Sequence, residues 1–325
     1  MGGWRLTALP LAVAALMAAS APVLAQGKYP SRPIRVILPF AAGSVSDVTL
    51  RILADKLGPR LGTTIIVDNQ PRAGGTTAAA AVLSSTRDGY SLMTLSSSTA
   101  ISVSLFNSLP YDPVADFAPV SGMSTFANII AVNETSKYRT LGDLLAAARE
   151  KPGTLNFGTT TVGSTNHLAA NLLKSMSGLN FVIVPFRTPG DLLTGVLRND
   201  VDVIIQSYGA LKSAVESKQI RALASTTPAR APYAPDVPTV DEAGVKGFDV
   251  VTWNGFFAPT GTPPEVVETL NREVQAVLAD PDLKKRYADL GLEPLTAGPT
   301  ALGGLLRNEI RKWGRVISEA GIEKQ

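Results

Sequence analysis

The sequence predicts an α/β protein of two domains, each built on a mainly parallel sheet. Short apolar runs typical of buried strands alternate with helical patterns along the chain. Such alternation favours parallel sheets with helices on both faces. The pattern also occurs twice, once on each side of residue 126. A chain of 325 residues is long enough for two such domains.

The first part of the chain alternates strands and helices, and its strands end in loops of small residues. The run IRVILPF is followed by a helical pattern from about Ser46 to Gly62, and glycine is common directly after a helix. The loop NQPRAGG precedes the helical run TTAAAAVLSS, and a third strand ends in the serines 96–98. The predicted strands are residues 34–40, 63–69 and 90–97.

The remaining chain repeats this pattern. Thr140 and Asp143 have the spacing of a helix-capping pair. Pro263-Pro264 opens a later helix, and the last helix is expected to end near Glu319. The predicted strands are residues 126–133, 155–160, 181–186, 201–207, 220–226 and 248–259.

The first sheet needs a place for the C-terminal helices, so the chain is expected to return to it after about residue 250. We predict domain 1 from residues 26–127 and 250–325, and domain 2 from residues 128–249. The crossings at residues 126–131 and 248–256 would form a hinge. The strand ends of both domains would then face one cleft, where open α/β sheets bind ligands.

Residues 1–25 are predicted to be a signal peptide. Arg5 precedes the apolar run LTALPLAVAALMAA, and Val23-Leu24-Ala25 offers a cleavage site after Ala25. A membrane anchor is the alternative, but the run falls short of the ~20 residues that span a bilayer. No arginine pair marks twin-arginine export. We therefore expect a mature chain that is free in the periplasm.

The composition excludes several classes of protein. The chain has no cysteine, which excludes a lipoprotein anchor, a cysteine nucleophile and a zinc-thiolate site. A net charge of +3 without a Lys/Arg-rich run gives no reason to expect nucleic acid as a partner. With one histidine and no acid-rich loop, we expect neither a metal nor a cofactor.

Two loops of small residues at predicted helix starts remain as the best candidates for a site. Gly43-Ser44 precedes one helix, and residues 160–165 precede another in the second predicted domain. Backbone N–H groups in the first turn of a helix are unpaired and attract carboxylates. The alternative is that these Ser and Thr residues are only N-caps.

An enzyme on the same fold is the alternative function. Ser164 and His167 would share one face of a helix. The local sequence, however, places no acidic residue where it could orient either side chain for catalysis. The motifs of the α/β-hydrolase nucleophile elbow and of the phosphate-binding P-loop do not occur. We therefore expect no catalytic residues.

The segment YPSRPIRVILPFAAGSVSD resembles the N-terminal signature of the Bug-type extracytoplasmic receptors, the solute-binding proteins of tripartite tricarboxylate transporters. Further matching segments follow in the same order: NQPRAGG, DGYSLMTLSS, FGTTTVGSTNHLAANLL, VPFRTPGDLLTGVLRNDVDVII, VPTVDEAG and TWNGFFAPTGTPPEVVETLN. The resemblance implies a two-domain Venus flytrap of the type II periplasmic-binding class. It also implies a small organic carboxylate as ligand and membrane transporter subunits as partners, with a sensor protein as the alternative partner. We expect the protein to be a monomer.

Several residues depart from the pattern of this family. Its first loop usually reads PFAPGGSTD; here Ala42 replaces the proline, and Ser44, Val45 and Ser46 replace the second glycine, the serine and the threonine, whereas Asp47 is kept. Asp47 would repel an anion, so we expect it to cap its helix or hold the N–H groups of the loop. Arg72 stands where the family often has glycine, Gln206 where it often has an acid and Asn254 where it often has tyrosine.

The predicted ligand-binding residues come from both domains. They are Ala42, Gly43, Ser44, Ser46, Ser97, Ser98, Thr159, Thr160, Gly163, Ser164, Thr165, His167, Arg187 and Gln206.

Overall fold

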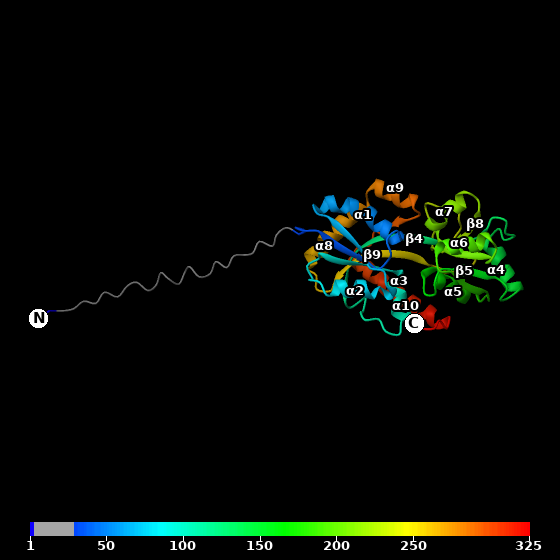
Figure 1. The fold of residues 1–325 in the computed structure, drawn as a ribbon, viewed down its shortest axis with the longest axis horizontal. Coiled ribbons are helices and arrows are strands. Elements are labelled where there is room, and N and C mark those ends of the chain that lie inside the picture. Colours follow the sequence, from blue (N-terminus) through cyan, green and yellow to red (C-terminus); the bar gives the residue numbers. More distant parts are fainter. Residues whose placement is uncertain (3–28) are drawn as a thin grey trace.

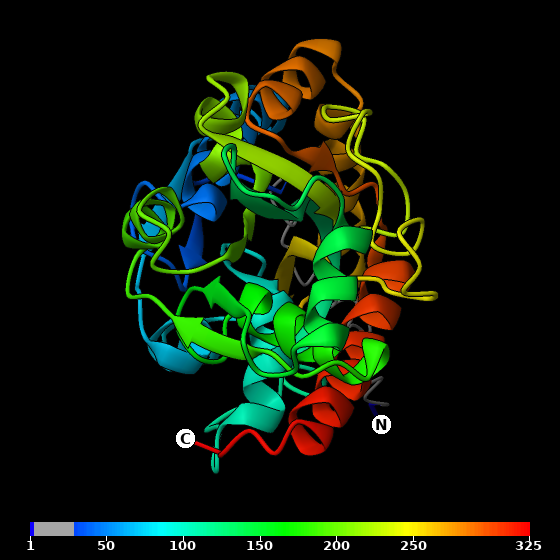
Figure 2. The ribbon, with the colours of Figure 1, turned by 90° about the vertical axis from the view of Figure 1, so that its right-hand side faces the viewer.

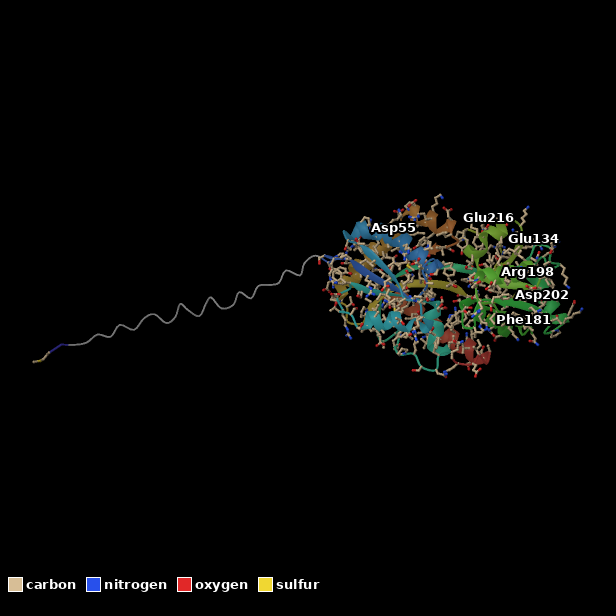
Figure 3. The ribbon with its side chains drawn as sticks, in the orientation of Figure 1. Asp55, Glu134, Phe181, Arg198, Asp202 and Glu216 are labelled. Carbon is tan, nitrogen blue, oxygen red and sulfur yellow. The ribbon has the colours of Figure 1, made fainter. Side chains whose placement is uncertain are left out.

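The computed structural model of the chain describes residues 1–2 and 29–325. Apart from its first two residues, the predicted signal peptide of residues 1–25 lies outside the described residues, as does its cleavage site. The described chain forms two lobes that lie side by side (Figure 1). Figure 3 labels Asp55 in the first lobe, and it labels Glu134 and Arg198 in the second.

The first lobe begins with strands and helices close to their predicted positions. Ser44 caps the first helix, and Gly62 ends it with a left-handed φ of 67°. This is the backbone conformation that glycine adopts at least cost. The elements are β1 (Ile34–Leu38), α1 (Val45–Leu61), β2 (Ile65–Asn69), the 3₁₀ turn η1 (Ala73–Gly75), α2 (Thr76–Leu83), β3 (Ser91–Ser96) and α3 (Ser97–Leu105).

The second lobe repeats the alternation. The predicted capping pair is confirmed, because Thr140 Oγ1 accepts the Asp143 N–H at 3.1 Å and Asp143 Oδ2 accepts the Thr140 N–H at 2.9 Å. The elements are α4 (Leu141–Glu150), β5 (Asn156–Thr159), α5 (Thr165–Ser177), β6 (Val182–Pro185), α6 (Pro189–Leu197), β7 (Val203–Ser207), α7 (Tyr208–Glu216) and β8 (Ile220–Ser225).

Two long strands and the C-terminal helices complete the fold. The last helix packs on α3 and reaches α5 of the second lobe, where Ser175 Oγ donates to Glu319 Oε2 at 3.3 Å. Figure 2 shows this red helix running beside the green second lobe. The elements are β4 (Phe117–Asn133), β9 (Val251–Pro259), α8 (Pro264–Leu278), α9 (Pro281–Asp289), β10 (Glu293–Pro294) and α10 (Pro299–Glu319).

The strands form one mixed sheet that continues through both lobes. Its order is β2-β1-β3-β9-β4-β7-β5-β6, and β8 and β10 also pair with β4. Pairing is parallel among β1, β2 and β3 and among β5, β6 and β7. The strands β4 and β9 run antiparallel to their neighbours. Strand β4 pairs with β9 up to Ala127 and with β7 from Asn128 onward, so the lobes meet at this point of the sheet.

The α/β fold class is confirmed, and helices cover both faces of the sheet. In the first lobe α1, α8 and α9 pack on one face, and α2, α3 and α10 pack on the other (Figure 1). The sequence had not indicated α3, α9 or the beginning of β4. No helix in the described part of the chain combines the length and the apolar character that a bilayer span requires.

Candidate ligand-binding site

A cavity lies where loops of both lobes meet. Its volume is about 830 Å³, within the ~300–1,000 Å³ range of small-molecule sites. The first lobe contributes the loops after β1 and β2 and one side of α3, and the second lobe contributes the loop after β5. The lining residues are Pro39, Phe40, Ala41, Pro71, Arg72, Gly74, Gly75, Ser98, Thr99, Ser102, Leu105, Phe106, Thr161, Val162, Gly163, Ser164 and Gln325.

The lining combines apolar surface with hydroxyl groups and one charge. Phe40, Leu105 and Phe106 supply apolar side chains, and the lining serines and threonines supply hydroxyls. Arg72 is the one lining residue with an ionisable side chain. Such a lining suits a small molecule that has an apolar body and a few polar or anionic groups.

The loop between β1 and α1 is held in shape by Asp47. The Gly43 N–H donates to Asp47 Oδ2 at 2.9 Å, and Ser44 Oγ accepts the Asp47 N–H at 3.3 Å. Arg51 Nε and Asn69 Nδ2 also donate to this carboxylate, at 3.0 and 2.9 Å. Burial alone would raise the pKa of Asp47, but the hydrogen bonds from Arg51, Gly43 and Asn69 outweigh it and keep the pKa below its usual value. The expectation that Asp47 holds the N–H groups of its loop is therefore confirmed.

The loop between β5 and α5 repeats this geometry in the second lobe. Gly163 and Gly43 both have a φ of 80°. Ser164 Oγ accepts the His167 N–H at 3.2 Å, and the Gly163 N–H donates to His167 Nδ1 at 3.4 Å. His167 thus takes the place that Asp47 has in the first lobe, as a neutral instead of an anionic acceptor. Burial lowers the pKa of His167, which favours this neutral form.

Each loop leaves backbone donors at a helix start. The N–H groups of Val45 and Ser46, and those of Thr165 and Asn166, have no hydrogen-bond partner within the part of the chain that the structure describes. These are first-turn N–H groups, which a helix cannot satisfy internally. One such pair therefore comes from each lobe.

Some of the predicted site residues lie at the cavity. Ser98, Gly163 and Ser164 line it. The neighbouring residues Ala42, Gly43, Ser44, Thr160 and Thr165 belong to the same loops or directly follow them. The structure therefore brings the two predicted loops to one cavity.

Other predicted residues do not line the cavity. Ser97 and Thr159 have no exposed surface; Ser97 Oγ accepts the Trp253 N–H, and Thr159 Oγ1 donates to the Thr160 carbonyl. Ser46 Oγ donates to Asn254 Oδ1 at 2.9 Å. These hydroxyls fasten the cavity loops to neighbouring strands or to their own backbone.

The last three predicted residues also lie outside the lining. Gln206 Oε1 accepts the Ser207 N–H at 2.7 Å. Arg187 is exposed, just before α6. His167 is buried, and its Nδ1 atom accepts the Gly163 N–H.

Several lining residues were not among the predicted ligand-binding residues. Arg72, Gly74 and Gly75 belong to the loop NQPRAGG, in which Arg72 departs from the glycine that the family often has. The α3 residues Ser102, Leu105 and Phe106 gave no signal, because this helix was not predicted. Gln325 reaches the cavity through hydrogen bonds with Leu105 and Asn107, a long-range contact with no local pattern.

The pair Ser164 and His167 does not form a nucleophile and base. Ser164 Oγ accepts the backbone N–H of His167, while the imidazole Nδ1 faces the Gly163 N–H. Among residues 1–2 and 29–325, no group of three or more His, Asp or Glu side chains could hold a metal ion.

Comparison with known proteins places this geometry in a family. Residues 49–322 match the family described as the tripartite tricarboxylate transporter family receptor. The protein BugT of Bordetella pertussis is 33% identical over 306 residues, which cover 94% of each chain. A protein of R. palustris solved with adipate is 31% identical, with a TM-score of 0.80 over 91% of this chain and 100% of that one. MatC of Rhodopseudomonas palustris, solved with bound malate, is 30% identical, with a TM-score of 0.74 over 89% of this chain and 100% of that one.

Proposed function

The chain belongs to the tripartite tricarboxylate transporter receptor family, and we propose that it is a periplasmic receptor for a small organic carboxylate. The ligand binds in the cavity between the lobes, and membrane transporter subunits receive it. The observation that carries this proposal is the pair of matching loops, each of which presents unpaired first-turn N–H groups from one lobe. Helix starts of this kind stabilise carboxylates through hydrogen bonds and the helix dipole.

The ligands of two relatives support the carboxylate class. The R. palustris relative was solved with adipate, and MatC was solved with malate. Both compounds carry two carboxylates. We propose that this chain binds a compound of the same class, that it does so as a monomer, and that it leaves the ligand chemically unchanged.

We propose that the lobes are domains formed by residues 26–127 with 250–325 and by residues 128–249. The change of partner in β4 between Ala127 and Asn128 supports this division. On the other crossing segment, the Val250 N–H donates to the Thr226 carbonyl of the second lobe, whereas Val251 pairs with Ala127. Both crossing segments therefore change their pairing partners beside the Ala127–Val251 pair, and two adjacent crossings of this kind suit a hinge. Small-angle scattering tests whether the two lobes close on the ligand. The radius of gyration should decrease when ligand is added, and an unchanged radius of gyration at saturating ligand would contradict closure of the lobes.

A thermal-melting panel tests the proposed function. The panel contains mono-, di- and tricarboxylates, aromatic acids, and the methyl ester and amide of each acid that raises the melting temperature. A ligand at about 100 times its Kd adds about 2.7 kcal/mol to the free energy of unfolding, so a true ligand gives a clear shift. We expect at least one acid to bind and its full ester to fail.

Two results of this panel would contradict the proposal. A full ester that binds as well as its acid would contradict recognition of a carboxylate. Conversion of the ligand during incubation would favour the alternative, an enzyme on the same fold.

A further inference from the structure

We propose that Arg72 binds a second acidic group of the ligand, so that this receptor selects α,ω-dicarboxylates with a hydrocarbon spacer over the corresponding monoacids. This inference rests on the proposed function, in which the helix starts of the two loops hold the first carboxylate. It assigns the second end of the same ligand to a residue on the loop after β2.

Arg72 is the one charged side chain of the cavity lining. It is exposed, and no carboxylate of residues 29–325 forms an ion pair or a hydrogen bond with it in the structure. Arginine presents a planar fork of donors that matches a carboxylate with two parallel hydrogen bonds. Because none of the lining side chains is acidic, the guanidinium group of Arg72 favours an anionic ligand as its partner.

The loop that carries Arg72 has a fixed backbone. The Gly75 N–H donates to the Arg72 carbonyl at 2.9 Å, and the hydroxyl of Tyr111 donates to the Gly74 carbonyl at 2.7 Å. Tyr111 is itself buried, with 7% of its surface exposed. The guanidinium group thus extends from an anchored turn, which limits the entropy lost when it binds a ligand.

The end of α3 joins the two sides of the cavity. Leu105 lies against Gly163 of the second-lobe loop, and the ring of Phe106 lies against Gly74, two residues after Arg72 in the sequence. Both apolar side chains line the cavity. The end of α3 therefore supplies apolar side chains between the proposed positions of the two acidic groups, and these suit a hydrocarbon spacer.

The same lining disfavours a ligand with an amino group. No Asp or Glu is among the lining residues, and Arg72 is a cation, so a bound ammonium group would lose water without gaining a counter-charge from a lining side chain. Such burial is costly. We therefore expect amino-substituted dicarboxylates to bind more weakly than the unsubstituted acids.

Calorimetry on the mature chain tests the proposal with α,ω-dicarboxylates from succinate to sebacate and with their monomethyl esters. The wild-type protein should bind its best diacid at least about tenfold more tightly than the half-ester. This is the ratio of affinities expected for one hydrogen bond between charged groups. Arg72→Gln should reduce this ratio to about one by weakening the diacid alone. The melting temperature of this variant without ligand should stay unchanged, because no described residue forms a hydrogen bond or an ion pair with the Arg72 side chain.

Arg198→Gln is the matched control. Arg198 is another exposed arginine, but it lies in the second lobe and is absent from the cavity lining (Figure 3). This variant should keep the wild-type ratio between diacid and half-ester.

The outcomes separate this inference from the function on which it rests. If acids bind the wild-type protein, two results refute the role of Arg72 while the receptor function stands. In the first, Arg72→Gln weakens binding of the diacid and of the half-ester equally; in the second, it weakens binding of neither. If no carboxylate of any kind binds the wild-type protein, both are refuted.

Discussion

Gly163 lies so close to Leu105 of α3 that a Cβ atom on Gly163 would be 2.2 Å from Leu105 Cδ2. The two residues belong to different lobes and both line the cavity. Gly43, the counterpart of Gly163 in the first lobe, has the same φ of 80° but no atom within 4 Å of an added Cβ. The second-lobe loop is thus packed on the first lobe, whereas the first-lobe loop is open.

Alanine at each of these glycines should separate backbone strain from contact between the lobes. Gly43→Ala should lower the free energy of unfolding by about 1–2 kcal/mol, the cost of a left-handed backbone in an L-residue. Gly163→Ala should lower it by a further ~1–3 kcal/mol, because the new methyl group overlaps Leu105. Urea denaturation measures both values.

A second substitution checks the cause of this difference. Leu105→Ala in the Gly163→Ala background should recover part of the additional loss, because it makes room for the methyl group. Equal losses for the two single variants would contradict a tight contact between the lobes.

Asp47→Asn should lower stability at neutral pH by about 1.5–3 kcal/mol, because it weakens hydrogen bonds to a charged group. The folded pKa of Asp47 lies below its ordinary value of 3.8. Its stabilisation is therefore complete above that value and is lost as the pH falls through the folded pKa. Urea denaturation between pH 7 and pH 3 should show this acid-dependent loss in the wild type and a smaller one in the variant.

Asp55→Asn is a control for this measurement on the same helix. Asp55 is exposed (Figure 3), and its replacement should leave the acid dependence unchanged. An equal effect of the two variants would contradict the role of Asp47 in holding the loop.

His167 should make stability depend on pH near neutrality. Burial lowers its folded pKa below the ordinary value of 6.5. The stabilisation from the neutral imidazole is complete above pH 6.5 and is lost as the pH falls through the folded pKa. His167→Gln should remove this dependence, and an NMR titration of the single histidine would report the pKa directly. A folded pKa above 6.5 would contradict the acceptor role of Nδ1 toward Gly163.

Arg187→Ala should change ligand affinity by less than about twofold, because an exposed charge without a partner contributes little. Arg187 was predicted to bind ligand, but it lies outside the cavity lining. Calorimetry with the best acid of the panel measures the effect. A loss of tenfold or more would mean that Arg187 reaches the ligand in the closed protein.

Local patterns in the sequence were sufficient for most elements and for both site loops. The apolar run of β1 and the capping residues Ser44 and Thr140 carry their signals within a few residues. The left-handed glycine that ends α1 does the same. In each case the interactions are local, so the sequence order is enough to predict them.

The elements that were missed depend on contacts between distant residues or have weak local preferences. The beginning of β4 contains Pro119 and Gly122, which disfavour strands, and register shifts with β9 accommodate them. The helix α3 is rich in serine and β-branched residues, which are poor helix formers. It forms because α10 covers it, a partner from the other end of the chain. The apolar wall of the cavity could not be predicted for the same reason.

An NMR titration with the best acid of the panel tests the central claim most directly, namely that one ligand is held by both lobes. The account predicts that the backbone amide signals of Val45 and Ser46 shift together with those of Thr165 and Asn166, with one common Kd. Shifts confined to one loop, or absent from both while the acid binds, would contradict capture of the carboxylate between the two helix starts.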